Sequence, residues 1–236
     1  MRLSMGFVKV AEGEEKGKLP DMRMNETPDT LKTFTGGIAD TNAYLYGCPE
    51  GNILIDAPEG TAEAFQGERI SLLFLTHGHF DHVWDAAKIA RLHGCPVFMH
   101  TITETMMADK NLLRRFGMDL EVEPLAADRR IGEGSCSFLG RDFEIFEVPG
   151  HCPGSLCLYT AGEEGKPGTL FGGDVLFAGG VGRWDLPGGD RDLLISGIQN
   201  KLLPLPSETI VHAGHGPSTT IGREKTGNPY LQQIIP

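Results

Sequence analysis

The chain has 236 residues, of which 40% are hydrophobic and 22% are charged, a composition typical of a folded globular protein. Its 21 Lys and Arg residues are outnumbered by 32 Asp and Glu residues, which gives a formal net charge of −11. This charge argues against a nucleic-acid backbone or an anionic membrane surface as partner, whereas a small acidic substrate stays compatible with it.

The cysteines and the apolar segments bear on the compartment. Five cysteines, an odd number in a chain of this length, are not typical of a disulfide framework. The first residues show no apolar core of the secretory type, and no run of 18 apolar residues suggests a membrane span. We therefore expect a cytoplasmic protein in a reducing setting, and the sequence leaves its oligomeric state open.

In chain order, residues 1–30 are predicted to form an irregular segment that includes a short strand at 6–10. Apolar runs and turn residues then predict strands and helices up to about residue 116. The expected elements of this first half are strands at 42–47, 52–57, 72–76 and 96–99, a helix at 83–93 that ends before Gly94, and one or two short helices at 101–116.

The second half repeats the order of strands followed by a helix. The expected elements are two strands within 137–148, strands at 156–160, 169–171 and 209–211, and a helix at 192–203 that ends before Pro204. The repeated order indicates two sheets packed face to face with helices outside. We therefore predict an α/β fold with a four-layer αββα arrangement, in one domain that spans residues 1–236.

The most informative feature of the chain is a polar turn between an apolar strand and a helix. The turn places three imidazoles and one carboxylate within six positions: His77, His79, Asp81 and His82. Imidazole and carboxylate together suit zinc, iron or manganese. Asp81 alone could instead cap the helix. A catalytic zinc ion with an open position takes only three protein ligands, so four candidates in one turn indicate two neighbouring ions.

Three later positions extend this set, each directly after a short apolar strand and each flanked by glycine. They are His151, Asp174 and His215. Glycine lets the backbone approach an ion closely, and ends of neighbouring strands can share one rim. Each residue alone would be unremarkable, and the signal is the set.

The remaining candidates carry weaker signals. Cys152 follows His151 directly, but a lone Cys is more often a small buried residue. Asp56 closes a strand and is a candidate to hold a ligand imidazole by a hydrogen bond. His93, His100 and His212 lack a comparable context, and we expect them to be structural or solvent-facing.

The pattern His77-x-His79-x-Asp81-His82, followed by His151, Asp174 and His215, resembles the metallo-β-lactamase superfamily and, within it, the glyoxalase II-like branch. Segments 182–190 and 214–230 carry further likeness to that branch, and the resemblance extends over about residues 33–232. It implies the αββα fold and two divalent metal ions. It also implies that His77, His79 and His151 bind the first ion, that Asp81, His82 and His215 bind the second, and that Asp174 bridges both.

Two features depart from glyoxalase II itself. That enzyme has a helical C-terminal domain that helps to bind glutathione, and this chain is expected to lack it. Trp184 stands where a small residue such as Thr is expected, and it is a candidate to line the substrate mouth. Arg183, Arg223 and Lys225 are the basic residues nearest the motifs, so they are candidates to contact an anionic substrate or else solvated charges.

The ligand pattern together with this resemblance therefore implies a dinuclear hydrolase, with zinc or else iron or manganese, and the resemblance implies that it cleaves a small-molecule thioester of the S-acylglutathione type. A metal-bridging hydroxide would be the nucleophile, and Asp81 would both ligate and orient it. A thiolate, with a pKa of about 8.5, leaves without much protonation, which suits a site with no obvious general acid. The alternative is a mononuclear non-haem iron oxidoreductase similar to persulfide dioxygenases, with two His and one carboxylate on the iron.

Overall fold

The computed structural model describes residues 30–115, 118–163 and 165–232. The strand expected at 6–10 and the irregular segment before residue 30 lie outside these residues. The described residues include two sheets of six strands each. In spatial order the first sheet consists of β1 (Leu31–Gly36), β2 (Thr41–Cys48), β3 (Gly51–Ile55), β4 (Leu72–Phe74), β5 (Val97–Met99) and β6 (Arg129–Arg130).

The second sheet mixes antiparallel pairs with one parallel pair, between β10 and β13. In spatial order it consists of β14 (Thr219–Thr220), β13 (Ile210–Ala213), β10 (Thr169–Gly173), β9 (Leu156–Thr160), β8 (Arg141–Glu147) and β7 (Gly134–Phe138). A separate hairpin of β11 (Leu176–Phe177) and β12 (Gly180–Val181) follows β10.

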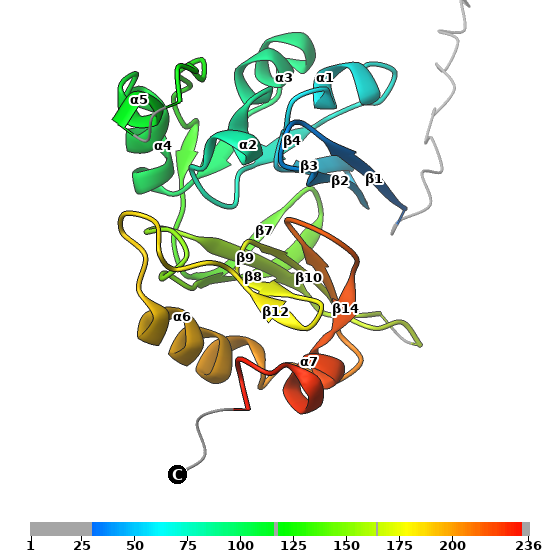
Figure 1. Ribbon diagram of the computed structural model, residues 1–236. Helices are drawn as coiled ribbons and strands as arrows, with labels where there is room; N and C mark the ends of the chain where they lie inside the picture. Colours follow the sequence, from blue (N-terminus) through cyan, green and yellow to red (C-terminus); the bar gives the residue numbers. More distant parts are fainter. Residues whose placement is uncertain (1–29, 116–117, 164, 233–236) are drawn as a thin grey trace, which may run out of the picture.

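Helices cover the outer face of each sheet, which gives the four layers in Figure 1. On the side of the first sheet lie α1 (Thr61–Ala64), α2 (Phe80–Val83), α3 (Ala86–His93), α4 (Thr101–Ala108) and α5 (Leu112–Arg115). On the side of the second sheet lie α6 (Arg191–Gly197), which continues into the π-helical turn η1 (Ile198–Leu202), and α7 (Ile221–Gly227). The αββα arrangement predicted from the order of the elements is confirmed.

Three hydrophobic clusters fill the spaces between the four layers. Because side chains alternate along a strand, Leu45 of β2 packs toward the outer helices while Tyr44 and Tyr46 pack between the sheets. Leu156 and Leu158 of β9 face the same inter-sheet core from the other side. The third cluster lies between the second sheet and α6.

The prediction of one helix at 83–93 is wrong in one respect. The helix is interrupted between the end of α2 at Val83 and the start of α3 at Ala86. Asp85 lies at the break, where its backbone N–H donates to the carbonyl oxygen of Ala57 at 2.8 Å. Its carboxylate accepts hydrogen bonds of 3.0 Å from the backbone N–H groups of Gly60 and Ala62 at the start of α1. These contacts satisfy backbone N–H groups at the start of α1. They join residues more than 20 positions apart, so a local sequence pattern does not reveal them.

Several short elements are absent from the sequence-based prediction. β1, β6, β14, α1 and α7, together with the β11–β12 hairpin, consist of two to seven residues and lack a long apolar run. The helix predicted at 192–203 begins at Arg191, and its second half is the π-helical turn η1. In the described part of the chain, no helix is both long and apolar enough to cross a membrane.

Candidate metal centre

The seven predicted metal ligands meet at one rim between the two sheets. His77, His79, Asp81 and His82 lie on the turn after β4 and on α2, and the other three follow strands of the second sheet: His151 after β8, Asp174 after β10 and His215 after β13. The backbone N–H of Leu156 donates to the carbonyl oxygen of Thr76 at 2.9 Å, which joins the two sheets beside the site.

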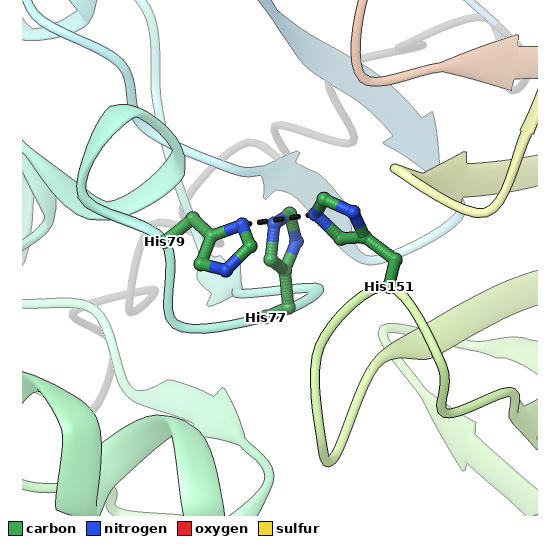
Figure 2. Close-up of side chains that lie close together, drawn as sticks. All are labelled: His77, His79 and His151. Carbon is green, nitrogen blue, oxygen red and sulfur yellow. Dashed lines mark hydrogen bonds between the residues drawn. The ribbon is translucent and has the colours of Figure 1, made fainter. Parts of the chain in front are cut away.

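The first group of ligand candidates consists of His77, His79 and His151, which point toward one another in Figure 2. Their ring centroids are 4.5 to 5.0 Å apart. Nε2 of His151 lies 2.9 Å from Nδ1 of His79. Each ring offers one nitrogen, and these nitrogens all lie within 4.8 Å of one another, so the group could hold a metal ion.

The second group consists of Asp81, His82 and His215, whose ligand atoms also lie within 4.8 Å of one another. Asp81 Oδ2 lies 3.4 Å from Nε2 of His215 and 3.6 Å from Nε2 of His82. One carboxylate and two imidazoles lie close together here, so this group could hold a second ion.

Asp174 contacts members of both groups. Its Oδ1 lies 3.2 Å from Nε2 of His82, and its Oδ2 lies 3.2 Å from Nε2 of His215. The same Oδ2 lies 3.5 Å from Nε2 of His151 in the first group. Asp174 also forms a possible ligand set with His77 and His82. Its position between the groups is the position that a shared ligand requires.

Hydrogen bonds at Nδ1 fix which nitrogen of three imidazoles faces the centre. Nδ1 of His151 donates to the carbonyl oxygen of Arg183 at 2.8 Å. Nδ1 of His82 donates to Oδ2 of Asp56 at 2.7 Å. Because the hydroxyl of Thr76 donates to Asp56, its oxygen accepts from Nδ1 of His77 at 3.0 Å. In the neutral form of each ring the lone pair therefore lies on Nε2, which faces the centre.

Asp56, which the sequence suggested as a partner of a ligand imidazole, contacts His82, one of the candidate ligands. Asp56 has a φ of 59°, in the left-handed region that Asp and Asn tolerate better than most residues. Its carboxylate also accepts the backbone N–H of Thr76 at 2.8 Å. This one buried carboxylate therefore orients His82 directly and His77 through the hydroxyl of Thr76.

Buried polar atoms without partners show that the donor set suits a cation. Nε2 of His77, Nε2 of His82 and Oδ1 of Asp174 are buried and have no hydrogen-bond partner among the described residues. Such atoms are rare because an unsatisfied buried group costs free energy. Divalent ions bound by these residues would satisfy all three atoms, and imidazole with carboxylate suits zinc, iron or manganese.

Gly214 shows how tightly the backbone encloses this set. A Cβ at Gly214 would lie 2.1 Å from Oδ1 of Asp174 and 2.7 Å from Cε1 of His82. No side chain fits at such distances without displacing one of the two candidate ligands. The glycine that precedes His215 is therefore required by the close approach of its loop to the centre.

The pKa values of the histidines differ between the two ligand groups. Burial lowers the pKa of His77 well below its ordinary value and lowers the pKa of His79 to about 4. Burial acts in the same direction on His82 and His215, but contacts with Asp174 and a second carboxylate outweigh it. They raise the pKa of His82 well above its ordinary value and the pKa of His215 to about 10. The carboxylates thus favour positive charge at this point, which a metal ion supplies.

The four candidate substrate residues differ in whether they line the cavity beside the ligand groups. Arg183 lines the site through its backbone, whose carbonyl oxygen accepts from His151, while its exposed guanidinium pairs with Asp185 at 2.7 and 2.8 Å. Trp184 packs against Tyr230, with ring centroids 6.1 Å apart, and lines a neighbouring hollow with Arg183. Arg223 and Lys225 are exposed on α7, and neither lines the cavity beside the ligand groups in the described part of the chain.

Cys152 and the three other histidines have contacts outside the ligand groups. Cys152 is buried with its Sγ 3.6 Å from Sδ of Met106, and burial raises the pKa of its thiol to about 11. His212 is buried against Tyr44 and bonds to Ser218, with 2.8 Å between Nδ1 and Oγ. His100 accepts the backbone N–H of Ile102 at the start of α4, and His93 lies at the end of α3. None of the four belongs to a possible ligand group in the described ranges.

Thr41 and Asn42 are site residues that sequence reasoning did not single out. The buried hydroxyl of Thr41 donates to Oδ2 of Asp81 at 2.7 Å. The amide of Asn42 donates to the carbonyl oxygens of Ala213 and Gly216 at 3.1 and 2.9 Å, on both sides of His215. The start of β2 therefore positions the second group, through contacts between residues that are 40 or more positions apart.

A cavity of about 660 Å³ opens beside the ligand groups. His79, Asp81, His151, Asp174 and His215 all contribute to its lining. The volume lies in the range of pockets that bind small molecules. The arrangement can therefore bring a small substrate against both ligand groups.

Comparison with known proteins places these features in a family. The sequence profile described as the metallo-beta-lactamase superfamily matches residues 36–215, which is most of the chain and includes all seven candidate ligands. The hydroxyacylglutathione hydrolase GloC of Haemophilus influenzae is 38% identical over 200 residues, which cover 80% of this chain and 92% of that protein.

Two solved structures share the fold at similar identity. The BLEG-1 B3 metallo-beta-lactamase is 36% identical, with a TM-score of 0.76, and the match covers 86% of this chain and all of that chain. The protein TTHA1623 in a di-iron-bound form is 37% identical, with a TM-score of 0.74, and the match covers 85% of this chain and all of that chain.

Proposed function

The chain belongs to the metallo-β-lactamase superfamily, and from this membership we propose that it is a dinuclear metal-dependent hydrolase of thioesters. The proposed substrates are of the S-acylglutathione type. The similar Haemophilus protein is a hydroxyacylglutathione hydrolase, which supports this substrate class. The proposed metal is zinc, with iron or manganese as alternatives, and the di-iron form of the similar TTHA1623 supports keeping iron among them.

One observation carries the proposal of two ions: Asp174 contacts His151 of the first group and both histidines of the second. A carboxylate that contacts both groups is suited to act as a ligand shared by two neighbouring ions. We therefore assign His77, His79 and His151 to one ion, Asp81, His82 and His215 to the other, and Asp174 to both.

Two bound divalent ions would supply a hydroxide nucleophile at neutral pH and polarise the carbonyl group of the substrate. The residues of the chain orient this chemistry. Thr41 donates to Oδ2 of Asp81 and so fixes the carboxylate that faces the cavity. The hydrogen bonds at Nδ1 of His77, His82 and His151 hold each Nε2 toward the centre.

The leaving group explains why a thioester suits this site. The groups that line the cavity beside the ligands are apolar or paired, and Arg183 pairs with Asp185. The described lining thus contains no lysine, tyrosine or free carboxylic acid positioned as a proton donor. A thiolate, with an ordinary pKa of about 8.5, leaves without protonation, whereas an amine or alkoxide needs a proton.

The alternative function is a mononuclear iron oxidoreductase similar to persulfide dioxygenases. Such a site needs two His and one carboxylate, and His77, His82 and Asp174 form a possible set of this kind. The second group, with Asp81 and His215 beside the same carboxylate, favours two ions over one.

Hydrolysis of S-lactoylglutathione tests the proposed function. Protein loaded with two equivalents of zinc is expected to release free thiol, and an Asp81→Asn variant with the same zinc content is expected to lose most of this activity. No release above that of the variant would contradict the glutathione-thioester assignment. The same preparation is then assayed with a chromogenic β-lactam, for which the B3 enzyme is the reference, and with glutathione persulfide under iron loading.

A further inference from the structure

Apolar side chains form two walls of the cavity beside the ligand groups. One wall comes from the α4–α5 region and the other from the segment after the β11–β12 hairpin, and Pro153 also contributes to the lining. The apolar lining residues of the first wall are Ile102, Met106, Leu112, Leu113 and Met118, and those of the second are Leu186 and Pro187. Phe80 of α2, which follows His79 in the sequence, also lines the cavity.

Positive charge is scarce in the same lining. Among its described residues Arg183 is the single lysine or arginine. The guanidinium of Arg183 makes two hydrogen bonds to the carboxylate of Asp185, at 2.7 and 2.8 Å. The glutathione moiety carries two carboxylates and one ammonium group at neutral pH, and the described lining offers its carboxylates no unpaired cation.

The walls are also accessible, so they are not simply part of the core. Ile102 is 36% exposed, and Leu186 is partly exposed and lies outside the three core clusters. An apolar surface that encloses about 660 Å³ and adjoins catalytic groups gains free energy when an apolar ligand covers it.

We propose that this cavity binds an apolar substituent of the substrate, so that the substrate class is thioesters with an apolar acyl or thiol arm rather than thioesters recognised through the charges of glutathione. That the substrate is a thioester rests on the proposed function. That one of its arms is apolar rests on the two walls alone. A polar acyl group such as lactoyl would leave both walls uncovered. An alkyl chain of several carbons would cover them while its carbonyl group lies at the ligand groups.

Paired substrates separate the two arms of the thioester. For the acyl arm, kcat/KM is compared between S-acetylglutathione and S-hexanoylglutathione. For the thiol arm, it is compared between the methyl and hexyl thioesters of acetic acid. Burial of each added methylene is worth up to roughly fourfold, so the favoured arm is expected to gain about tenfold or more across its pair.

A binding measurement keeps the proposal testable if no thioester is hydrolysed. S-hexylglutathione and S-methylglutathione are thioethers that cannot be hydrolysed, and calorimetry gives their dissociation constants for the metal-loaded protein. The hexyl compound is expected to bind about tenfold or more tightly, with a larger negative heat-capacity change. Preferential hexyl binding without any thioester turnover would refute the proposed function and support the apolar cavity.

Leu186→Ser tests whether the wall itself makes the difference. The variant is expected to reduce the hexyl-to-methyl preference by about fivefold, because one apolar side chain of the wall is lost. Leu92→Ser is the matched control, since Leu92 is 60% exposed on α3 and does not line the cavity. Equal affinities for the hexyl and methyl compounds, together with equal kcat/KM within both substrate pairs, would overturn the proposal while leaving thioester hydrolysis intact.

Discussion

Replacement of Asp56 by Asn tests how the protein holds the imidazoles of the centre. The carboxylate of Asp56 accepts from the backbone N–H of Thr76, from the hydroxyl of Thr76 and from Nδ1 of His82, at 2.8, 2.8 and 2.7 Å. Asn has the same shape and tolerates the positive φ of this position, so the variant changes the hydrogen bonding with little backbone strain.

An amide has one oxygen, so it cannot accept all three hydrogen bonds. If its oxygen accepts from the backbone of Thr76, its NH2 group faces Nδ1 of His82, which must then become an acceptor. The proton of neutral His82 moves to Nε2, the atom that faces Asp174. Loss of a hydrogen bond to a buried charged group costs roughly 1.5–3 kcal/mol of stability. Loss of such a partner behind a ligand weakens metal binding by about 10- to 100-fold.

Competition with a chromogenic zinc chelator measures the affinities of the two ions. Asp56→Asn is expected to bind its more weakly held ion about 10- to 100-fold less tightly than the unmodified protein. Asp128→Asn is the control. The carboxylate of Asp128 accepts a hydrogen bond of 2.8 Å from the backbone N–H of Val97, and this contact involves none of the candidate ligands. Two zinc affinities unchanged in Asp56→Asn would refute the reasoning, whatever the stability of the variant.

Three further predictions concern other contacts of the site. Thr41→Val removes the donor to Oδ2 of Asp81 and is expected to weaken binding of one zinc ion by about tenfold, measured with the same chelator; unchanged affinity would contradict it. Gly214→Ala places a methyl group 2.1 Å from Oδ1 of Asp174 and is expected to abolish binding of at least one ion, measured by metal analysis, whereas Gly67→Ala, where nothing lies within 4 Å of the added atom, is expected to retain both. Burial lowers the pKa of His212 to about 4, so the unfolded chain takes up a proton below about pH 6.5 that the folded protein does not. Stability is therefore expected to fall as the pH falls from 6.5 toward 4, by about 2 kcal/mol at pH 5, and His212→Gln to flatten this slope in urea unfolding of the metal-free protein; an equal slope in both proteins would exclude the assignment.

The ligand candidates could be found from the sequence because each carries a local signal. Four of them lie within six positions of one turn, and His151, Asp174 and His215 each follow an apolar strand beside a glycine. Strand ends of neighbouring sheets meet at a rim, so the same pattern predicts convergence. The order of strands and helices likewise predicts the four layers, because amphipathic elements must bury one face each.

Contacts between distant residues account for what the sequence did not predict. Thr41 and Asn42 look like ordinary strand residues, and their role depends on segments 40 to 174 positions away. The break between α2 and α3 depends on the contacts of Asp85 with Gly60 and Ala62. Arg183 contributes a backbone oxygen to His151, which any residue at that position can supply, so its side chain gave no reliable signal.

β1 shows a second reason for missing an element. Leu31–Gly36 pairs with β2 at the edge of the first sheet, and most of its side chains are exposed. An edge strand with polar and apolar residues in a short stretch has no apolar run that marks it. Its hydrogen bonds to β2 define it, and these depend on the fold as a whole.

A titration of the metal-free protein with zinc tests the central claim, two ions in one hydrolytic site, most directly. Thiol release from an S-acylglutathione is measured after each addition, together with oxygen consumption. Turnover that requires the second equivalent of zinc, with no oxygen consumed, is the predicted result. Full turnover at one equivalent would contradict the assignment of two ions, as would activity that appears only with iron and oxygen.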